Sequence, residues 1–374
     1  MEFNPDLTKQ ASEVLFSHKK VKPVHPPLRF NGQVVKRFDD QKHLGLILDS
    51  KLSFMKHINS KLVIATKNIS VIKSLFKYLS TNVLNQMYKV FVRSHLDYCD
   101  FIYHCPPIIQ HSPLGISLSG PMESIEKIQY LAALAVTGAW HGSNRSKLYE
   151  ELGWESLSDR RMFRRALQLF KISNGMTPSY LSDKLPPRRR LSLFNDGISL
   201  SFRVLRCRSS RYANSFFPDA IVSWNNLISN FSVMPSILKF KSHITSLIRP
   251  NRKSTFGIHD PDGIRFLFMI RLNLSPLRSH KFRHNFIDTP SEICVCSQGI
   301  EDTSHFLLLC PLYINPRLSL HATANDLVLK YNLPISQRNY RFFLYGHHLM
   351  NHDDNKSMLV ATIKFIKETK RFSS

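Results

Sequence analysis

The sequence predicts a mostly α-helical fold with a small N-terminal β region, a helical middle and a small C-terminal domain built around cysteine and histidine. Three observations lead to this fold class. A helical stripe of apolar residues begins at Phe54, the first fifty residues carry short strand-like runs, and three of the six cysteines gather between residues 294 and 310. With 374 residues and 43% hydrophobic composition, the chain is long enough for two or three domains with buried cores.

The charge balance gives the first indication of function. Lysine and arginine number 51 against 27 aspartates and glutamates, which gives a formal net charge of +24 and a pI of about 9.9. Such an excess is typical of proteins that bind nucleic acid through its phosphates. A basic but inert surface and a membrane-surface protein are the alternatives. We therefore expect RNA or DNA as the partner.

The sequence predicts an intracellular protein without a membrane span, and it leaves nucleus and cytoplasm open. The opening stretch MEFNPDLTKQ is polar and carries two acids, unlike a secretory signal. No run approaches the ~18 apolar residues of a spanning helix. Cys99, Cys105 and Cys207 are scattered along the chain, which does not resemble a disulfide framework.

The first fifty residues predict β structure. VLF (Val14 to Phe16) is a short apolar run followed by a proline-rich connector. LRFNGQVV then places Asn31-Gly32 between two apolar runs, which is the strongest short hairpin signal. HLGLILD (His43 to Asp49) predicts a further, buried strand.

From Phe54 the hydrophobic period becomes helical. Apolar residues recur every three or four positions as far as Leu79, which predicts a long helix. A coiled-coil seam is one interpretation, but a helix packed in a bundle fits better because a second helix, capped by Ser80 or Thr81, follows at once. We expect two antiparallel helices joined by a short turn.

Proline residues between Cys105 and Pro121 predict a linker, and a further helix follows it. The stretch SLSDRRMFRRALQLFKIS then predicts a helix that Ser158 caps. Nine basic residues and two acids lie between Asp159 and Arg190. A charge run is usually a solvated face, but in so basic a chain this density favours a phosphate-binding surface. The predicted contacts are Arg160, Arg161, Arg164, Arg165, Arg188, Arg189 and Arg190.

The cysteine cluster has the spacing C-x-C-x8-H-x4-C, formed by Cys294, Cys296, His305 and Cys310. Two thiolates one residue apart can face one ion, and the histidine and last cysteine can complete a tetrahedral set of ligands suited to Zn²⁺. Three buried thiols and a satisfied core histidine form the alternative. Bound metal would supply folding free energy to this short segment directly.

Basic residues interleaved with rings precede the cluster. Arg278, Lys281 and Arg283 alternate with His280, Phe282, His284 and Phe286. Cations can contact phosphates while rings stack on bases. We expect the metal to hold this basic segment against a nucleic acid.

Several blocks resemble one family in their order along the chain. They are FNPDLTKQ with VLFSHKK, HLGLILDSKLSF, YKVFVRSHLDYCDFIY, IEKIQYLAALAVTGAW, KLYEELGWESL, SFFPDAIVSWNNL and the Cys-His cluster. In this order they resemble the C-terminal half of jockey-like non-LTR (LINE-type) retrotransposon polyproteins. The resemblance covers nearly the whole chain.

The resemblance implies roles for individual segments of a reverse transcriptase. FNPDLTK corresponds to the end of the palm, with Lys9 near the incoming nucleotide, and His43 to Gly45 correspond to the primer grip. The Cys-His cluster corresponds to a zinc knuckle that grips element RNA or target DNA, and Ser297 stands where many relatives have glycine. The implied ranges are 1–52 (palm remnant and primer-grip-like β region), 53–104 (helical thumb), 105–121 (linker), 122–250 (basic helical connector) and 251–374 (zinc-knuckle domain).

The resemblance also implies that the catalytic carboxylates of the family enzyme, which hold two Mg²⁺ ions, precede FNPD and thus Met1. Three acidic stretches could stand in for them, but none has the family's F/Y-x-D-D pattern in the expected place. These stretches are Asp39-Asp40, Asp97 with Asp100, and Asp353-Asp354.

We therefore expect a truncated reverse transcriptase that binds nucleic acid and has lost polymerase chemistry. One alternative is half of an active reverse transcriptase, completed by another polypeptide or by a mispredicted upstream exon. Its partner would then be the missing palm segment or another element-encoded protein. The other is a host-adopted module that binds a protein through its helical stripe. Binding to phosphate should weaken steeply with salt, whereas binding to a protein through apolar contacts should not.

Overall fold

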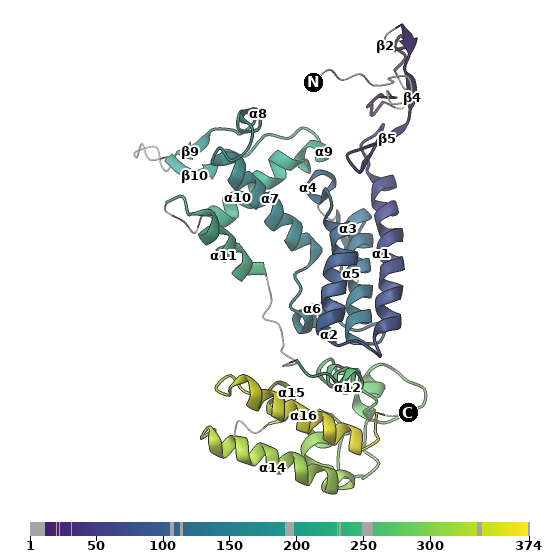
Figure 1. Ribbon diagram of the computed structural model, residues 1–374, viewed down its shortest axis with the longest axis vertical. Coiled ribbons are helices and arrows are strands. Elements are labelled where there is room, and N and C mark those ends of the chain that lie inside the picture. The colour runs from purple at the N-terminus through teal and green to yellow at the C-terminus, as the bar shows by residue number, and fades with distance from the viewer. Residues whose placement is uncertain are drawn as a thin grey trace. The chain divides into compact units, whose positions relative to one another are not determined.

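Helices dominate the computed structural model, and its strands are few and short (Figure 1). The structure describes residues 12–19, 21, 23–30, 32–104, 108–112, 115–190, 198–229, 231, 233–248, 257–334 and 339–372. The chain divides into two compact units, and each consists of three separate stretches of sequence. Unit 1 comprises Met1–Thr66, Ser94–Lys127 and Leu157–Thr245, and unit 2 comprises Lys67–Arg93, Ile128–Ser156 and Ser246–Ser374. The five consecutive ranges expected from the sequence stay a prediction.

The N-terminal strands are two to four residues long. β1 (Ser12–Val14) pairs in parallel with β4 (Lys36–Phe38). β2 (Arg29–Phe30) and β3 (Gln33–Val34) form the predicted hairpin, in which Gly32 has a φ of 79°. Asn31, the other residue of that predicted turn, lies outside the described residues.

The single strand expected from His43 to Asp49 is wrong, because the chain reverses within it. β5 (Asp40–His43) and β6 (Leu46–Asp49) pair antiparallel across the two-residue turn Leu44-Gly45, where both φ angles are positive at 46° and 85°. Two positive φ angles match the twist of a tight hairpin. A Cβ on Gly45 would lie 2.8 Å from the hydroxyl of Tyr98, which donates to the Leu44 carbonyl. Position 45 therefore requires glycine for two reasons, its positive φ and the close approach of Tyr98.

The predicted helical stripe is confirmed in α1 (Met55–Leu75), whose buried residues include Ile58, Ala65 and Ile72. Ser80 precedes the next helix as expected, although its side chain makes no capping hydrogen bond. The second helix is divided into four pieces, with a π-helical turn after the first and Cys99, whose φ is 57°, before the last. These pieces are α2 (Thr81–Met87), the π-helix η1 (Tyr88–Arg93), α3 (Ser94–Asp97) and α4 (Asp100–Tyr103).

The predicted linker between residues 105 and 121 contains a β-hairpin. β7 (Ile108–Ser112) and β8 (Gly115–Ser119) pair antiparallel along their length. α5 (Pro121–Thr137) then begins at Pro121, a residue that suits the first turn of a helix because it needs no N–H there.

The remainder of unit 1 is built around α7 (Leu157–Ser173). The predicted cap at Ser158 is wrong, because the helix already includes Leu157, which is 1% exposed. Phe170 on this helix packs with Trp224 and Phe240 to form an aromatic core. The other elements are α8 (Ser179–Ser182), β9 (Arg188–Arg190), β10 (Ile198–Phe202), α9 (Ser210–Ala213), α10 (Phe216–Ile228) and α11 (Ile237–Ile248).

Unit 2 has a second aromatic core, in which Phe306 contacts Phe365 and Phe372. α14 (Ile314–Lys330) lies alongside α16 (His352–Glu368) (Figure 1). The other elements are α6 (Arg145–Leu152), α12 (Pro261–Arg271), α13 (Arg278–Arg283), the π-helix η2 (His305–Leu309), the 3₁₀ helix η3 (Pro311–Tyr313) and α15 (Tyr340–Tyr345). Within the described residues, no helix has both the length and the apolar composition that crossing a bilayer requires.

Candidate metal centre

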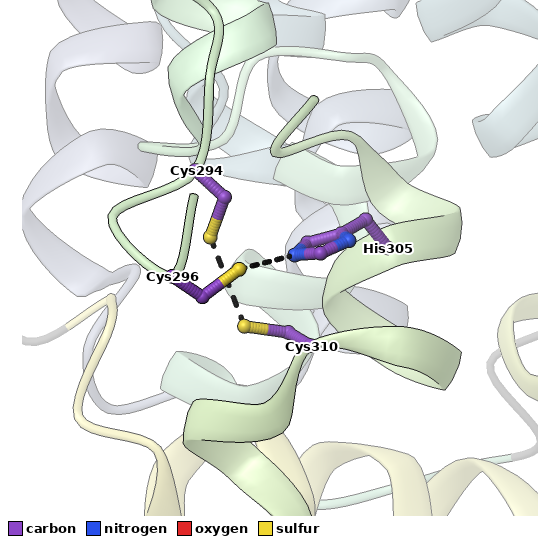
Figure 2. A group of neighbouring side chains, drawn as sticks. All are labelled: Cys294, Cys296, His305 and Cys310. Carbon is purple, nitrogen blue, oxygen red and sulfur yellow. Dashed lines mark hydrogen bonds between the residues drawn. The ribbon is translucent and has the colours of Figure 1, made fainter. Parts of the chain in front are cut away.

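The four residues that the spacing singled out meet at one point in unit 2 (Figure 2). The ligand atoms of Cys294, Cys296, His305 and Cys310 all lie within 4.8 Å of one another. This convergence confirms the prediction that they form one cluster, and such a cluster could hold a metal ion. In the part of the chain that the structure describes, no other group of His, Cys, Asp or Glu side chains meets this condition.

Two distances within the cluster are close to those of a tetrahedral zinc site. The sulfur atoms of Cys294 and Cys310 lie 3.7 Å apart, and two sulfurs bound to zinc at ~2.3 Å in a tetrahedron lie roughly 3.8 Å apart. The Cys296 sulfur lies 3.2 Å from Nε2 of His305, a few tenths of an ångström less than the roughly 3.6 Å expected of a sulfur and a nitrogen. Three thiolates and one imidazole would fill all four positions.

A tight turn brings the first two cysteines to one side of the centre. The N–H of Cys294 donates to the carbonyl of Gly299 at 2.8 Å, and the N–H of Ser297 donates back to the carbonyl of Cys294 at 2.9 Å. The turn closes through Ser297, whose φ of 60° lies in the left-handed region. Gly299, later in the same loop, has a φ of 147°, a conformation that glycine adopts without strain.

A π-helical turn aligns the other two ligands. Residues five apart on an α-helix point roughly 140° away from each other, because the helix turns once every 3.6 residues. In η2 the N–H of Cys310 instead donates to the carbonyl of His305 at 2.7 Å, across five residues. The wider turn brings the histidine ring and the last sulfur to the same side.

Backbone N–H groups point at the sulfur atoms of the cluster. The N–H of Gln298 donates to the Cys296 sulfur at 3.4 Å. The N–H groups of Cys296 and Leu312, each two residues beyond a cysteine, make the same contact with Cys294 and Cys310. Donors aimed at sulfur stabilise its thiolate form, which is the form that binds metal.

Burial and these donors act on the thiols in opposite directions. Burial raises the pKa of Cys294 to about 12, and it also raises the pKa of Cys310. For Cys296, burial works upwards, but the Gln298 N–H and the neighbouring thiols lower its pKa. A divalent cation would replace these protons, so metal binding at this centre should weaken as the pH falls.

Two arginines that the sequence analysis missed hold the second half of the centre in place. Arg317 is 6% exposed and donates to the carbonyls of Phe306, Leu307 and Cys310 at 2.8–3.1 Å, so it satisfies the C-terminal end of η2. Arg371 makes a two-pronged ion pair with Glu301 at 2.9 Å. No local pattern marks these contacts, because each arginine reaches its partners only in the fold.

The donor set indicates a structural role for a metal here. Thiolate and imidazole are ligands that suit zinc, and a set of four protein ligands leaves no position open for water or substrate. Structural zinc sites share this closed arrangement, whereas catalytic ones keep one ligand position free. The centre can therefore stabilise the fold around it, and the reactive chemistry of an open zinc site does not apply.

The basic segment before the cluster is partly engaged and partly exposed. Arg278 donates through its side chain to the carbonyl of Ser291 at 3.2 Å, and Lys281 pairs with Asp288 at 2.8 Å. Arg283 is exposed, and so are three hydrophobic or aromatic neighbours, Phe282 (43% exposed), Phe286 and Ile287.

His280 is not part of this surface. Its side chain is 3% exposed and lies 2.6 Å from the Ser275 hydroxyl. Burial lowers the pKa of His280 to about 4, so the ring stays neutral at pH 7.

In unit 1 the four arginines predicted on α7 do not form a free cationic face. Arg160 makes a two-pronged contact with Asp97, and Arg164 pairs with Asp100 at 2.9 Å. Arg161 is 1% exposed and lies against Met122. Side chains so engaged hold α7 against the preceding helices. The exposed phosphate contact predicted for Arg161 is wrong, because this side chain is buried.

Arg165 is the most deeply buried of the four. Its side chain is fully buried, pairs with Asp219 at 2.9 Å and donates to the carbonyls of Phe101 and Ser215. The guanidinium also lies 5.3 Å from the ring centre of Phe216. The structure therefore gives Arg165 a structural role in unit 1 in place of the predicted phosphate contact.

The other predicted contacts are placed as follows. Arg188 donates to the carbonyl of Leu200 and lies over the Phe202 ring, and Arg189 donates to the Phe202 carbonyl. His43 is exposed at the end of β5, beside the turn that contains Gly45. Lys9 and the side chain of Arg190 lie outside the described residues, and the nucleic-acid contacts of all these residues stay predictions.

Four of the six carboxylates that could have stood in for the polymerase aspartates are paired with a lysine or an arginine. Asp40 pairs with Lys56, and Asp354 accepts from Lys330 at 2.7 Å. Asp97 and Asp100 accept from the arginines of α7 described above. None of these carboxylates lies in a metal-holding group among the described residues.

Comparison with protein-family models, with curated proteins and with solved structures finds no match to this chain.

Proposed function

We propose that this chain binds nucleic acid, and that zinc bound by the Cys294, Cys296, His305 and Cys310 cluster holds the binding segment in shape. The convergence of these four ligands within 4.8 Å carries the proposal. Arg278 links the two parts, because its N–H donates to Glu301 at 2.8 Å and Glu301 belongs to the loop between the two ligand pairs. Folding of the centre therefore fixes Arg278, the first residue of the basic segment that precedes it.

The net charge of +24 supports a polyanionic partner. The exposed side chains of Arg283, His284 and Phe282 can meet a polynucleotide with both charge and rings. Phosphate contacts of this kind are independent of base sequence and are screened by salt.

On the resemblance of its ordered blocks, the chain is further proposed to be part of a non-LTR retrotransposon reverse transcriptase. In such an enzyme paired aspartates hold two Mg²⁺ ions for nucleotide transfer. The engagement of Asp40, Asp100 and Asp354 by cations supports the view that these 374 residues alone do not extend a primer. Measurable primer extension by the purified chain would overturn this part of the proposal.

The zinc proposal is tested with a double variant and a matched control. The purified chain should contain about one zinc ion, which Cys294→Ser with Cys310→Ser should remove. Cys99→Ser with Cys207→Ser changes two free cysteines outside the cluster and should keep the zinc. Binding to a labelled RNA should weaken in the first variant alone. A metal-free chain that binds RNA with unchanged affinity would refute the proposal.

A further inference from the structure

An aromatic pair in unit 2 joins the basic segment to a distant part of the sequence. The rings of Trp140 and Phe286 have their centres 6.0 Å apart and are inclined by 40°. Trp140 is partly exposed, and Phe286 is 40% exposed. A partly exposed tryptophan beside an exposed phenylalanine presents ring surface to solvent next to a basic segment.

The loop that carries Trp140 is held in a fixed shape. The N–H and the hydroxyl of Ser143 both donate to the carbonyl of Trp140, at 3.2 and 2.5 Å. The N–H of Gly142, whose φ is 93°, donates to the hydroxyl of Tyr130 at 3.0 Å. Because these bonds form within the free protein, little ordering would be needed when a ligand binds.

The loop that carries Phe286 is fixed in the same way. The N–H of Phe286 donates to the carbonyl of Lys281 at 3.2 Å, and the carbonyl of Phe286 accepts from Thr289 at 3.1 Å. The ammonium of Lys281 lies 5.8 Å from the centre of the Phe286 ring and pairs with Asp288. Charge and ring therefore already lie together at this surface.

The charges around the pair favour a polyanion over a protein as the occupant. Asp288 is already paired with Lys281, while Arg283, the last residue of α13, and His284 after it are exposed. His141, beside Trp140, is exposed as well. A ring surface bordered by such groups can stack an unpaired base while the cations contact its phosphates.

We propose that Trp140 and Phe286 form a stacking platform for unpaired bases, and that the ligand of this surface is single-stranded nucleic acid. This inference rests on the proposed nucleic-acid-binding function. It adds that the ligand is single-stranded and that Trp140 and Phe286 contact its bases. Duplex bases are stacked on one another and do not offer a free face to the two rings.

Tryptophan fluorescence tests the platform directly. The chain has three tryptophans, and Trp154 and Trp224 are 4% and 0% exposed, so a ligand can reach Trp140 alone. Adding a single-stranded RNA or DNA 12-mer to the full chain should quench the emission of Trp140, and a duplex of the same sequence should not. Comparison of the RNA and DNA oligonucleotides shows which of the two nucleic acids the chain prefers.

Variants complete the test. Anisotropy of labelled RNA should show about tenfold weaker binding for Trp140→Ala, as expected for the loss of one base–ring stack. Tyr180→Ala removes a ring that is 64% exposed in unit 1 and should bind as the wild type does. Circular dichroism of each variant checks that the fold is retained, and Trp140→Phe should recover most of the lost affinity.

Failure of the platform is distinguishable from failure of the proposed function. Binding by anisotropy without quenching, or with full affinity in Trp140→Ala, would overturn the platform and leave nucleic-acid binding in place. Equal quenching by duplex and single strand would also overturn it. If no oligonucleotide bound at all, both proposals would fail together.

Discussion

Two basic regions with similar sequence patterns differ in how far their arginines are buried and paired. On α7 in unit 1, Arg161 and Arg165 are buried, and Arg160 and Arg164 are paired with aspartates. In the segment from Arg278 to Ile287 in unit 2, Arg283 and its aromatic neighbours remain exposed. In the second region Arg283 can meet a ligand from an exposed position, although Arg278 and Lys281 are engaged within the protein.

The difference lies in where the acidic partners come from. Asp97 and Asp100 lie 63 and 64 residues before the α7 arginines they bind. The basic segment of unit 2 has one local acid, Asp288, which pairs with Lys281. A cationic run therefore becomes structural when distant acids fold onto it, and a local charge count cannot reveal this.

The largest effect on stability is expected when one guanidinium is removed from each region in turn. Arg165→Met should lower the stability of unit 1 by about 3 to 5 kcal/mol, because Asp219 is left without its partner in a partly buried site. Arg283→Met should stay within about 0.5 kcal/mol of the wild type. Hydrogen exchange of the α7 amides and of the unit 2 amides measures the two effects separately. Equal, small effects in both variants would show that the α7 arginines are not structural.

A second test concerns Asp100, the carboxylate beneath Arg164. Burial raises the pKa of Asp100 to about 6, although Arg164 works against this rise. The folded state therefore holds the proton more tightly than the unfolded chain, whose pKa is near 3.8. Unit 1 should gain stability from this group as the pH falls from about 6 to about 4, by roughly 2 to 3 kcal/mol.

Asp100→Asn should abolish that contribution. The difference in stability between variant and wild type, measured by α7 hydrogen exchange, should change between pH 4 and 6 and be flat above pH 7. Glu123→Gln on α5, also in unit 1, serves as the carboxylate control. A constant difference across the whole range would mean that Asp100 titrates in the folded protein as it does in the unfolded chain.

The same contrast shows how far the sequence could predict this molecule. Spacing alone identified the four residues of the metal centre, because three cysteines and one histidine fall within 17 positions. The periodicity from Phe54 identified α1, since burial of one helical face leaves its mark on every turn. Both signals are local, and local signals can be read from sequence.

Contacts that form only once the backbone has folded could not be predicted. Arg317 satisfies the end of η2 and Trp140 meets Phe286, yet neither contact has a sequence pattern. The Leu44-Gly45 turn was missed for a different reason: it lacks the asparagine or aspartate that usually marks a tight hairpin turn. The burial of Arg161 was missed because arginines are usually exposed and its surroundings come from other helices.

A third test compares binding in place of stability. Arg283→Gln should weaken RNA binding by a few-fold and reduce the slope of log affinity against log salt by about one, as the loss of one phosphate contact does. Arg164→Gln removes an equal charge from α7 and should leave the slope unchanged, since that side chain pairs with Asp100. Slopes that fall equally in both variants would place α7 in the nucleic-acid surface after all.

The smallest expected effect concerns the metal centre of unit 2 and the turn at Ser297. Ser297 closes the turn between the first two cysteines with a φ of 60°, a conformation in which a Cβ lies close to the neighbouring carbonyl. Ser297→Gly removes that contact, at the cost of a more flexible unfolded chain, and should stabilise the metal centre by about 0.5 to 1 kcal/mol. Ser304→Gly, at a helical φ of −68°, should shift stability in the opposite direction. Zinc competition with a chelator measures both, and a two- to fivefold tighter site is expected for the first variant alone. If both glycines weakened zinc binding, the turn at Ser297 would not be a source of strain in the metal centre.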